Sequence, residues 1–400
     1  MSAGRPVDVD HVVVGLGGLG SAAAYWLARL SDEAGRPARV VGLEQYALGH
    51  DRGASQDHSR IIRLSYHTPH YVALARRAYR AWADVEAELG RSLIVRTGGL
   101  DLWPRGAAIP MEDYTSSLVA EGVPFELLDA AEIVRRYPPF RLDGDVVGLF
   151  QADAGIAPAA LGNAAHQQLA TARGAELRAH TAVSGIHSDG AGELNVTAAG
   201  ATYRTGSLVV CADAWTNDVL APLGVRLPLT VTREQVAYFP VRDPDGFAPE
   251  RFPVWIWMDD PSFYGLPVFG EPGAVKAAED VGGQPTTAAT RTFDSDEAAL
   301  HRLTGFLART VPGMVDGRTP RVKTCLYTLT PDRDFVLGDV PGHPGVQVAL
   351  GAAHGYKFAS WFGRTLAERA VHGSAGDDLA PFRIDRPVLL DPNPPVHHLV

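Results

Sequence analysis

Residues 9–20 read VDHVVVGLGGLG, and this stretch decides the fold of the N-terminal part of the chain. It predicts a short buried strand and a glycine-rich turn, and an apolar helix follows over residues 19–30. Residues 38–44 (ARVVGLE) predict a second strand that ends in an acid, Glu44. Together these elements indicate a dinucleotide-binding βαβ unit.

The turn is a G-x-G-x-x-G motif in which Gly18 is an additional glycine. Gly15 permits the tight turn, Gly17 lets a pyrophosphate approach the backbone, and Gly20 packs the helix on the strand. The helix N-terminus then faces the phosphates, and Glu44 would bind a ribose hydroxyl. A purely structural glycine turn is the alternative, and the flanking elements argue against it. The motif does not separate FAD from NAD, but its N-terminal position and the scattering of the other nucleotide-binding pieces favour FAD.

Composition limits the classes of partner that the chain fits. The 400 residues suit two entwined domains, and 46% hydrophobic residues are ample for a core. The net charge of −10 argues against nucleic acid. The start has no signal-peptide pattern, and no stretch approaches the roughly 20 apolar residues of a membrane span. The two cysteines, Cys211 and Cys325, favour a reducing cytoplasm and no disulfide framework.

The rest of the chain alternates between predicted helices and strands. The middle of the chain, residues 229–270, is rich in aromatic residues and proline and predicts several antiparallel strands. Apolar periodicity predicts helices over residues 70–89, 159–173, 294–310 and 357–371. Alternating or continuous apolar runs predict strands over residues 93–103, 176–186, 194–204, 207–211 and 346–351.

Several segments together resemble one enzyme family, and they occur in that family's order over nearly the whole chain. The most specific are S-R-I-I-R (59–63), C-L-Y-T-L-T-P-D (325–332) and H-G-Y-K-F (354–358). Others are GGLDLW, LVVCADAWTNDVL and FYGLPVFG. The chain is similar to the monomeric sarcosine oxidase and N-methyltryptophan oxidase family, within the D-amino-acid-oxidase-like flavoproteins. The resemblance implies an FAD enzyme that oxidises a C–N bond of a secondary amino acid and returns the electrons to oxygen.

The absence of a low-complexity linker predicts a discontinuous nucleotide domain with the aromatic β-rich part inserted. We therefore expect an α/β plus α+β fold with a Rossmann-like FAD-binding domain formed by residues 1–95, 150–228 and 331–400. An antiparallel-sheet substrate domain would comprise residues 96–149 and 229–330.

The resemblance assigns several residues to the cofactor. Arg60 would lie against the flavin, and Cys325 would hold the flavin covalently, which needs a thiolate at the ring edge. A buried apolar role is the alternative for Cys325, and we favour that role for Cys211. The turn from Gly351 to Lys357 would place a helix N-terminus near the flavin pyrimidine. The further cofactor-binding positions implied are Ser59, Val183, Gly355 and Lys357.

Other residues are assigned to the substrate and to oxygen. Arg63 and Lys357 would bind the substrate carboxylate, because a guanidinium offers a bidentate fork. Tyr264 and Tyr327 would line the cavity, although either fits a core role. Lys276 matches the lysine that promotes oxygen reduction, since a fixed cation stabilises the charge that develops on oxygen. Surface positions are the alternative for these cations.

Two positions depart from the family pattern, and one of them leaves the identity of the substrate undetermined. Asp280 stands where sarcosine oxidases have a cavity histidine, and Gln56 replaces another histidine. Asp280 would pair with Lys276 or another cation, or would face the distal end of a larger substrate; we slightly favour the distal position. Trp255 and Trp257 could line the cavity and stack on such a substrate, although packing in the core is the commoner role for tryptophan.

The resulting prediction is an FAD-dependent amine oxidase. Its substrate would be an N-methyl or cyclic amino acid, or a related biosynthetic intermediate, and its products an imine and hydrogen peroxide. The alternatives are an FAD dehydrogenase with another electron acceptor, an NAD-dependent reductase and a protein that binds FAD without turnover. The expected partners are the small amine and oxygen, in a monomer or small homo-oligomer, with no nucleic acid, membrane or metal.

Overall fold

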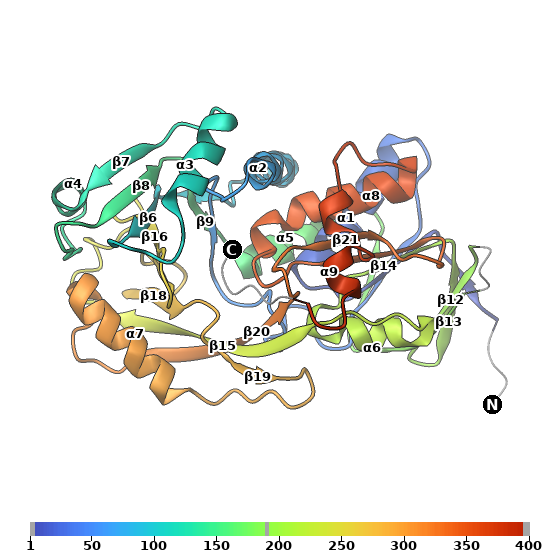
Figure 1. The fold of residues 1–400 in the computed structure, drawn as a ribbon. Coiled ribbons are helices and arrows are strands. Elements are labelled where there is room, and N and C mark those ends of the chain that lie inside the picture. Colours follow the sequence, from blue (N-terminus) through green and yellow to red (C-terminus); the bar gives the residue numbers. More distant parts are fainter. Residues whose placement is uncertain (1–4, 189–191, 395–400) are drawn as a thin grey trace.

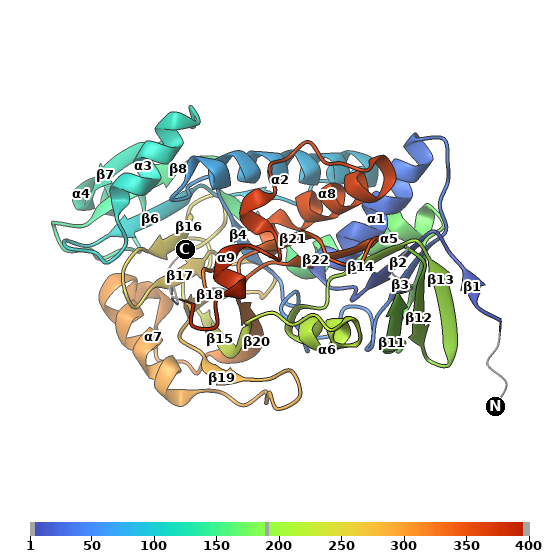
Figure 2. The ribbon, with the colours of Figure 1, turned by 45° about the vertical axis from the view of Figure 1, so that its right-hand side comes forward.

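A computed structural model describes residues 5–188 and 192–394 and shows two lobes side by side (Figure 1). One lobe contains a mainly parallel sheet, and the other contains a larger mixed sheet. Helix α2 (Pro69–Leu89) joins the lobes: it packs against α3 (Met111–Ala120) on one side and α8 (Ala359–His372) on the other (Figure 2).

The first sheet has six strands, and neighbouring strands run parallel except at the edge formed by β21 and β22. In spatial order they are β10 (Glu176–Arg178), β3 (Val40–Leu43), β2 (His11–Val14), β14 (Ser207–Val210), β22 (Val346–Leu350) and β21 (Val336–Asp339). The central strands are buried on both faces, which explains their continuous apolar sequences.

Different layers cover the two faces of this sheet. In β2, Val13 packs toward helices α1 (Gly18–Glu33), α5 (Ala159–Ala172) and α8, because alternate residues of a strand point to opposite faces. Val12 and Val14 pack toward a four-stranded sheet. Its strands are β1 (Val7–Asp8), β13 (Ala201–Thr205), β12 (Leu194–Ala198) and β11 (Val183–Ser188).

The second sheet is larger and lies in the other lobe. Most of its neighbouring strands are antiparallel, while β16 and β6 run parallel. Its strands are β19 (Gln284–Thr286), β15 (Thr230–Pro240), β18 (Ala274–Glu279), β17 (Phe263–Leu266), β16 (Val254–Trp257), β6 (Gly99–Trp103), β8 (Val147–Gln151) and β7 (Glu126–Asp129), with β20 (Arg321–Leu329) on the other edge of β15.

One face of the second sheet packs against helix α7 (Glu297–Thr310). Phe306 of α7 contacts Trp255 and Trp257, with ring centroids 6.2 and 5.3 Å away. Of the two roles considered for these tryptophans, the contacts support packing in the core rather than a substrate wall. Alternation along β16 directs them to the α7 face and leaves Ile256 facing the opposite side.

Shorter elements complete the described chain. They are the sheet of β4 (Arg60–Ile62), β9 (Gly155–Ala157) and β5 (Val95–Arg96), the helices α4 (Ala130–Arg136), α6 (Thr216–Leu220) and α9 (Pro387–Leu390), and the 3₁₀ turns η1 (Asp213–Trp215), η2 (Ala221–Leu223), η3 (Pro312–Met314), η4 (Tyr356–Phe358) and η5 (Ala380–Phe382).

The predicted helices are confirmed, but three predicted strands are divided. Residues 176–186 fall in β10 and β11, which lie in different sheets, and residues 194–204 fall in the antiparallel pair β12 and β13. Residues 93–103 form β5 and β6, which belong to different sheets. Gly98, between them, has a φ of +71°, a left-handed conformation that interrupts an extended strand. The strands of the larger sheet fall within residues 99–151 and 230–329. The domain boundaries themselves stay a prediction.

Candidate functional site

A groove of about 410 Å³ follows the glycine-rich turn and extends to the second sheet. Gly15, Gly17, Gly18, Glu44 and Val183 line this groove. Its lining combines glycines of the turn with a few polar side chains, as a binding site for a small molecule or cofactor requires.

The glycines of the turn are required by close contacts. Gly15 has a φ of +86°, and a Cβ there would lie 2.5 Å from the carbonyl oxygen of Cys211. A Cβ at Gly20 would lie 1.8 Å from the carbonyl oxygen of Gly15, and one at Gly18 would lie 2.8 Å from the ring of Tyr356. Gly20 therefore lets α1 pack closely on the turn, Gly15 lets the turn approach the backbone after β14, and Gly18 lets Tyr356 approach.

Glu44 lies at the end of β3 and is fixed in the groove. Its carboxylate accepts hydrogen bonds from the backbone amides of Leu16 and Tyr46, each at 3.0 Å, and lies 3.3 Å from His50. Burial acts to raise the pKa of Glu44, but the bonds from His50 and the two amides outweigh it and lower the pKa. The residue is therefore a charged acceptor, as ribose recognition requires.

The turn after β22 brings the backbone close to the groove. Gly351 and Gly355 touch, because a Cβ at Gly351 would lie 2.7 Å from the Gly355 Cα. Ala352 and Ala353 have φ values of 43° and 74°, so this turn is left-handed at two residues that are not glycine. The chain then continues into η4 and α8 beside the groove, near the start of the helix predicted from residue 357.

A second cavity of about 120 Å³ adjoins the groove, and both are lined by Arg60, Tyr327, Ala353 and Tyr356. The predicted residues that line it are Ser59, Arg60, Arg63, Tyr264, Lys276, Asp280, Tyr327 and Lys357. The structure thus brings together side chains from segments that are far apart in the sequence. Arg60 is anchored between the two spaces, because its guanidinium donates to the carbonyl oxygens of Ala54, Gln56 and Ser59.

Arg63 and Lys357 both line the cavity, and both lie near the ring of Tyr66. The Arg63 Cζ and the Lys357 Nζ are 5.3 and 5.8 Å from the ring centroid of Tyr66. Arg63 donates to the buried Asp101 at 2.8 Å, and Ser65 also donates to Asp101. Within residues 5–188 and 192–394, no acid lies within 4 Å of the Lys357 ammonium. Burial and the charge of Arg63 lower the pKa of Lys357 to about 7.

Lys276 lies at another part of the cavity wall, and its partner was not foreseen. The Lys276 Nζ is 2.7 Å from the Asp57 Oδ2 and 2.9 Å from the Ser59 carbonyl oxygen. Burial and the charge of Arg60 lower the pKa of Lys276 to about 8, although Asp57 favours the charged form. The alternative of a pair between Lys276 and Asp280 is therefore replaced by a pair with Asp57.

Asp280 and the two tyrosines share the cavity wall. The Tyr327 hydroxyl donates to the Asp280 Oδ1 at 3.2 Å. Burial and Arg63 lower the pKa of Lys357, while the charge of Asp280 acts to raise it. Burial raises the pKa of Tyr327 well above its usual range, so it is a neutral hydrogen-bond donor. Both tyrosines line the cavity, which supports the predicted position rather than a core role.

Both cysteines are free and buried. Cys325 lies on β20 between Lys323 and Tyr327, and these three side chains share one face of the strand. Burial raises the pKa of the Cys325 thiol to about 11, against the opposing charge of Arg60. Burial also raises the pKa of Cys211, which packs in the core of the first lobe, as predicted.

Two acids that the sequence did not single out are part of this site. Asp57 follows Gln56 just before the S-R-I-I-R segment, and Asp101 lies on β6 between two core leucines. The available signal for Asp101 was an acid inside an otherwise apolar strand. Gln56 itself donates to the Thr324 carbonyl oxygen at 3.0 Å. In the described part of the chain there is no cluster of metal ligands, and no helix long and apolar enough to cross a membrane.

The fold and the two adjoining spaces define a flavoprotein oxidoreductase, and comparison with protein families agrees. The family model described as FAD dependent oxidoreductase (DAO) matches residues 10–369, and the chain belongs to this family. The groove fits FAD: its glycines allow the backbone approach that a pyrophosphate needs, and Glu44 is a buried, charged acceptor. The α/β plus α+β fold class is confirmed.

Named relatives match over nearly their whole length. The chain is 35% identical to monomeric sarcosine oxidase of Streptomyces avermitilis over 93% of this chain and 96% of that protein. It is 30% identical to human peroxisomal sarcosine oxidase, covering 94% and 96%, and 28% identical to N-methyl-L-tryptophan oxidase of Salmonella arizonae, covering 94% and 98%.

Solved structures show the same fold. The open form of NikD, described as an unusual amino acid oxidase essential for nikkomycin biosynthesis, superposes with a TM-score of 0.82 at 30% identity, covering 94% of this chain and 97% of NikD. L-Proline dehydrogenase from P. horikoshii has a TM-score of 0.81 at 20% identity, covering 95% and 97%. That second likeness concerns the fold alone.

Proposed function

We propose that this chain oxidises a C–N bond of a small secondary amino acid, N-methyl or cyclic, or of a related biosynthetic intermediate. The products would be an imine and hydrogen peroxide. The observation that carries the proposal is the cavity beside the cofactor groove, where Arg63 and Lys357 converge and Lys357 has no described acidic partner within 4 Å. The names of the sarcosine and N-methyltryptophan oxidases support the same reaction class.

The cavity residues would bind and orient the substrate. Lys357 would receive the carboxylate as a cation, with Arg63 beside it as a second charge held in place by Asp101. Tyr264 and Ile256 would bound the remaining space and exclude water. The amine must reach the reactive position uncharged, because a protonated amine has no free electron pair. FAD, when bound, supplies a two-electron acceptor next to this cavity.

We propose that FAD is held by the glycine turn, Glu44 and Arg60, and is attached covalently through Cys325. The position of Cys325 on the same strand face as Tyr327, which lines the groove, supports this attachment. Burial raises the pKa of the thiol, and the nearby charge of Arg60 acts in the opposite direction and favours the thiolate. Acid precipitation tests it: the yellow colour should stay in the pellet, whereas Cys325→Ser should release it. Colour in the supernatant of the unmutated protein would contradict the attachment.

Oxygen is proposed as the electron acceptor because Lys276, a buried cation, lines the cavity next to the groove. An FAD dehydrogenase with another acceptor is the alternative, and the fold likeness to L-proline dehydrogenase does not distinguish the two. Stopped-flow reoxidation in air does: rapid return of the flavin colour with peroxide release supports the oxidase. We also keep as proposals a cytoplasmic location and a monomer or small homo-oligomer.

The experiment that tests the function is a screen of N-alkyl and cyclic amino acids under anaerobic conditions. A substrate should bleach the flavin absorbance, and its amide should do so only at much higher concentration. Primary amino acids of the same side chain are the matched control compounds. If no secondary amino acid bleaches the flavin while other compound classes do, the proposed substrate class is wrong.

A further inference from the structure

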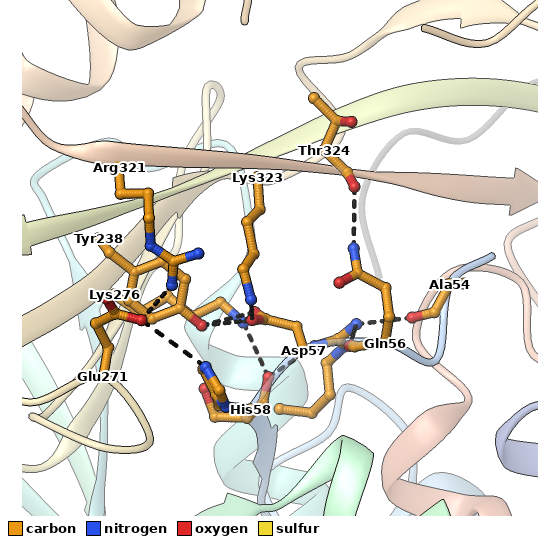
Figure 3. Close-up of polar contacts among 12 residues, drawn as sticks. Ala54, Gln56, Asp57, His58, Tyr238, Glu271, Lys276, Arg321, Lys323 and Thr324 are labelled. Atoms are coloured by element: carbon orange, nitrogen blue, oxygen red, sulfur yellow. Dashed lines mark hydrogen bonds and ion pairs between the residues drawn. The ribbon is translucent and has the colours of Figure 1, made fainter. Parts of the chain in front are cut away.

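Asp57 lies at the centre of a buried charge cluster (Figure 3). Its Oδ2 accepts from Lys276 at 2.7 Å, its Oδ1 accepts from Lys323 at 2.9 Å, and the Tyr238 hydroxyl donates to both oxygens at 2.7 Å. The Lys276 side chain is 4% exposed and that of Lys323 is 26% exposed. One carboxylate is therefore shared by an inner and an outer lysine.

The cluster connects the two spaces of the site. Asp57 lines the cofactor groove, and Lys276 lines the substrate cavity. The ion pair between them thus lies at the boundary where oxygen would meet the reduced cofactor in the proposed oxidase.

The backbone holds Asp57 in an unusual conformation. Its φ of 83° lies in the left-handed region, which residues other than glycine seldom adopt. The carbonyl oxygens of Asp57 and His58 accept from the amides of Ala160 and Ala159 at 3.0 and 3.2 Å, at the start of α5. The surrounding structure therefore fixes a strained residue, and such residues gather at functional sites. Aspartate is one of the residues that tolerate this conformation best, so the position accommodates the carboxylate that the two lysines share.

The distribution of lysine points to the same cluster. Every lysine of the sequence, Lys276, Lys323 and Lys357, lies at this site, while arginine supplies the basic charge elsewhere. A lysine changes its pKa readily when buried, whereas an arginine stays charged. The presence of a lysine rather than an arginine at position 323 is therefore consistent with a role for Lys323 in this cluster.

We propose that Asp57 is the positioning residue of Lys276, and that Lys323 competes with Lys276 for the same carboxylate and so sets the charge beside the oxygen site. The proposal rests on the proposed role of Lys276 toward oxygen, and it adds two residues that control that role.

The electrostatics predict opposite effects for the two partners. Asp57 favours the charged form of Lys276, whereas burial and the nearby Arg60 disfavour it. Loss of the Asp57 carboxylate would leave the buried Lys276 ammonium without an acid, which lowers the pKa of Lys276. Loss of Lys323 would leave Lys276 as the one lysine bonded to Asp57, which raises the pKa of Lys276. The other titratable or charged groups that face this cluster are Tyr238, Cys325, His58, Glu271 and Arg321.

The test compares the pH dependence of flavin reoxidation by oxygen in the unmutated holoenzyme, Asp57→Asn and Lys323→Met. In the unmutated protein the rate should fall as the pH rises through about 8, because Lys276 loses its charge. The midpoint of this fall should move to lower pH in Asp57→Asn, so that reoxidation at pH 8 and above becomes slower by up to about tenfold for every pH unit that the midpoint moves. It should move to higher pH in Lys323→Met.

The matched control is Arg318→Met, which removes an exposed cation that bonds Asp316, away from the cluster. It should leave the midpoint in place. Any result other than opposite movements of the midpoint in the two cluster variants would overturn the proposal. If Asp57→Asn does not fold, an unchanged midpoint in Lys323→Met is sufficient to overturn it.

The pH dependence of the flavin midpoint potential gives a second readout that does not require turnover. A cation next to the flavin raises the potential, so the curve should break at the pKa of Lys276, and Lys276→Met should lack the break. The break should move in the same opposite directions in the two variants. If air reoxidation is slow at every pH in the unmutated protein, the proposed oxidase function fails, and the potentials alone decide the role of Asp57.

Discussion

Two charge clusters beside the cavity each combine two cations with one buried aspartate, but the acid is shared differently. In one, Asp101 bonds Arg63 and Ser65, and Lys357 has no described acid within 4 Å. In the other, Asp57 bonds both Lys276 and Lys323 (Figure 3).

The difference separates two chemical tasks. The Arg63 and Lys357 region retains a cation that can accept an anion from outside, which suits a substrate carboxylate. In the Asp57 region both lysines are bonded to the same carboxylate, which suits a fixed charge near oxygen rather than a binding site for a substrate carboxylate. Under the proposed function, the same residue types would form a binding site in one place and a tuned charge in the other.

The largest expected effect is on stability, from removal of Arg63. Arg63→Met leaves the buried Asp101 without its cation, which should lower the free energy of unfolding by about 3–5 kcal/mol. Lys357→Met is the matched variant, and it leaves no acid unpaired, so its unfolding free energy should change little. Urea denaturation of both holoenzymes measures this. Equal losses of unfolding free energy in the two variants would contradict the inference that Asp101 depends on Arg63 and not on Lys357.

The oxygen step should respond next most strongly. Lys276→Met removes a charge whose interaction with an anion about 4 Å away is worth about 4 kcal/mol at an effective dielectric of 20. Reoxidation should slow by about a thousandfold, while anaerobic reduction changes less. Asp57 retains Lys323 and Tyr238 in this variant, so the fold should persist. An unchanged oxygen rate would assign the step to another group.

The effect on substrate binding through the carboxylate should be smaller than the effect on the oxygen step. Lys357→Met should weaken binding of substrates with a free α-carboxylate by about 1.5–3 kcal/mol, the usual value for a charged hydrogen bond. Amides of the same substrates should be affected far less. The comparison of binding constants for acid and amide in both proteins measures the effect, and equal losses would exclude a carboxylate role for Lys357.

The same site should depend on pH in a defined direction. The ammonium of Lys357, with a pKa near 7, is charged below that pH and neutral above it. Affinity for a carboxylate inhibitor that lacks a basic nitrogen should therefore fall as the pH rises through about 7. Lys357→Met should show no such fall. A profile that stays flat in the unmutated protein would mean that another cation binds the carboxylate.

The smallest expected effect concerns Asp280. Asp280→Asn removes a charged acceptor that now bonds Tyr327, and should weaken the true substrate by about 0.5–1.5 kcal/mol. Small N-methyl amino acids should be little affected, and sarcosine should be a poor substrate of the unmutated enzyme. Efficient turnover of sarcosine would contradict a distal contact by Asp280.

Much of the fold was readable because its signals are local. The βαβ unit follows from one continuous stretch, in which Gly15 has a left-handed φ of 86° and Gly20 is required by its contact with Gly15. The long helices α2 and α7 follow from apolar spacing. Trp255 and Trp257 show the limit, because periodicity gives two faces of a strand without saying which one meets the cavity.

The sequence by itself predicted the nucleotide-binding unit, the order of most elements, and a shared site for Arg63, Lys276 and Lys357, which line one cavity in the structure. The tertiary structure alone decided how those cations are paired. Asp57 and Lys276 are separated by 219 residues, and Arg63 and Asp101 by 38. No periodic pattern spans such distances, and an ion pair depends on ångström-scale geometry that arises only when the sheets and helices pack.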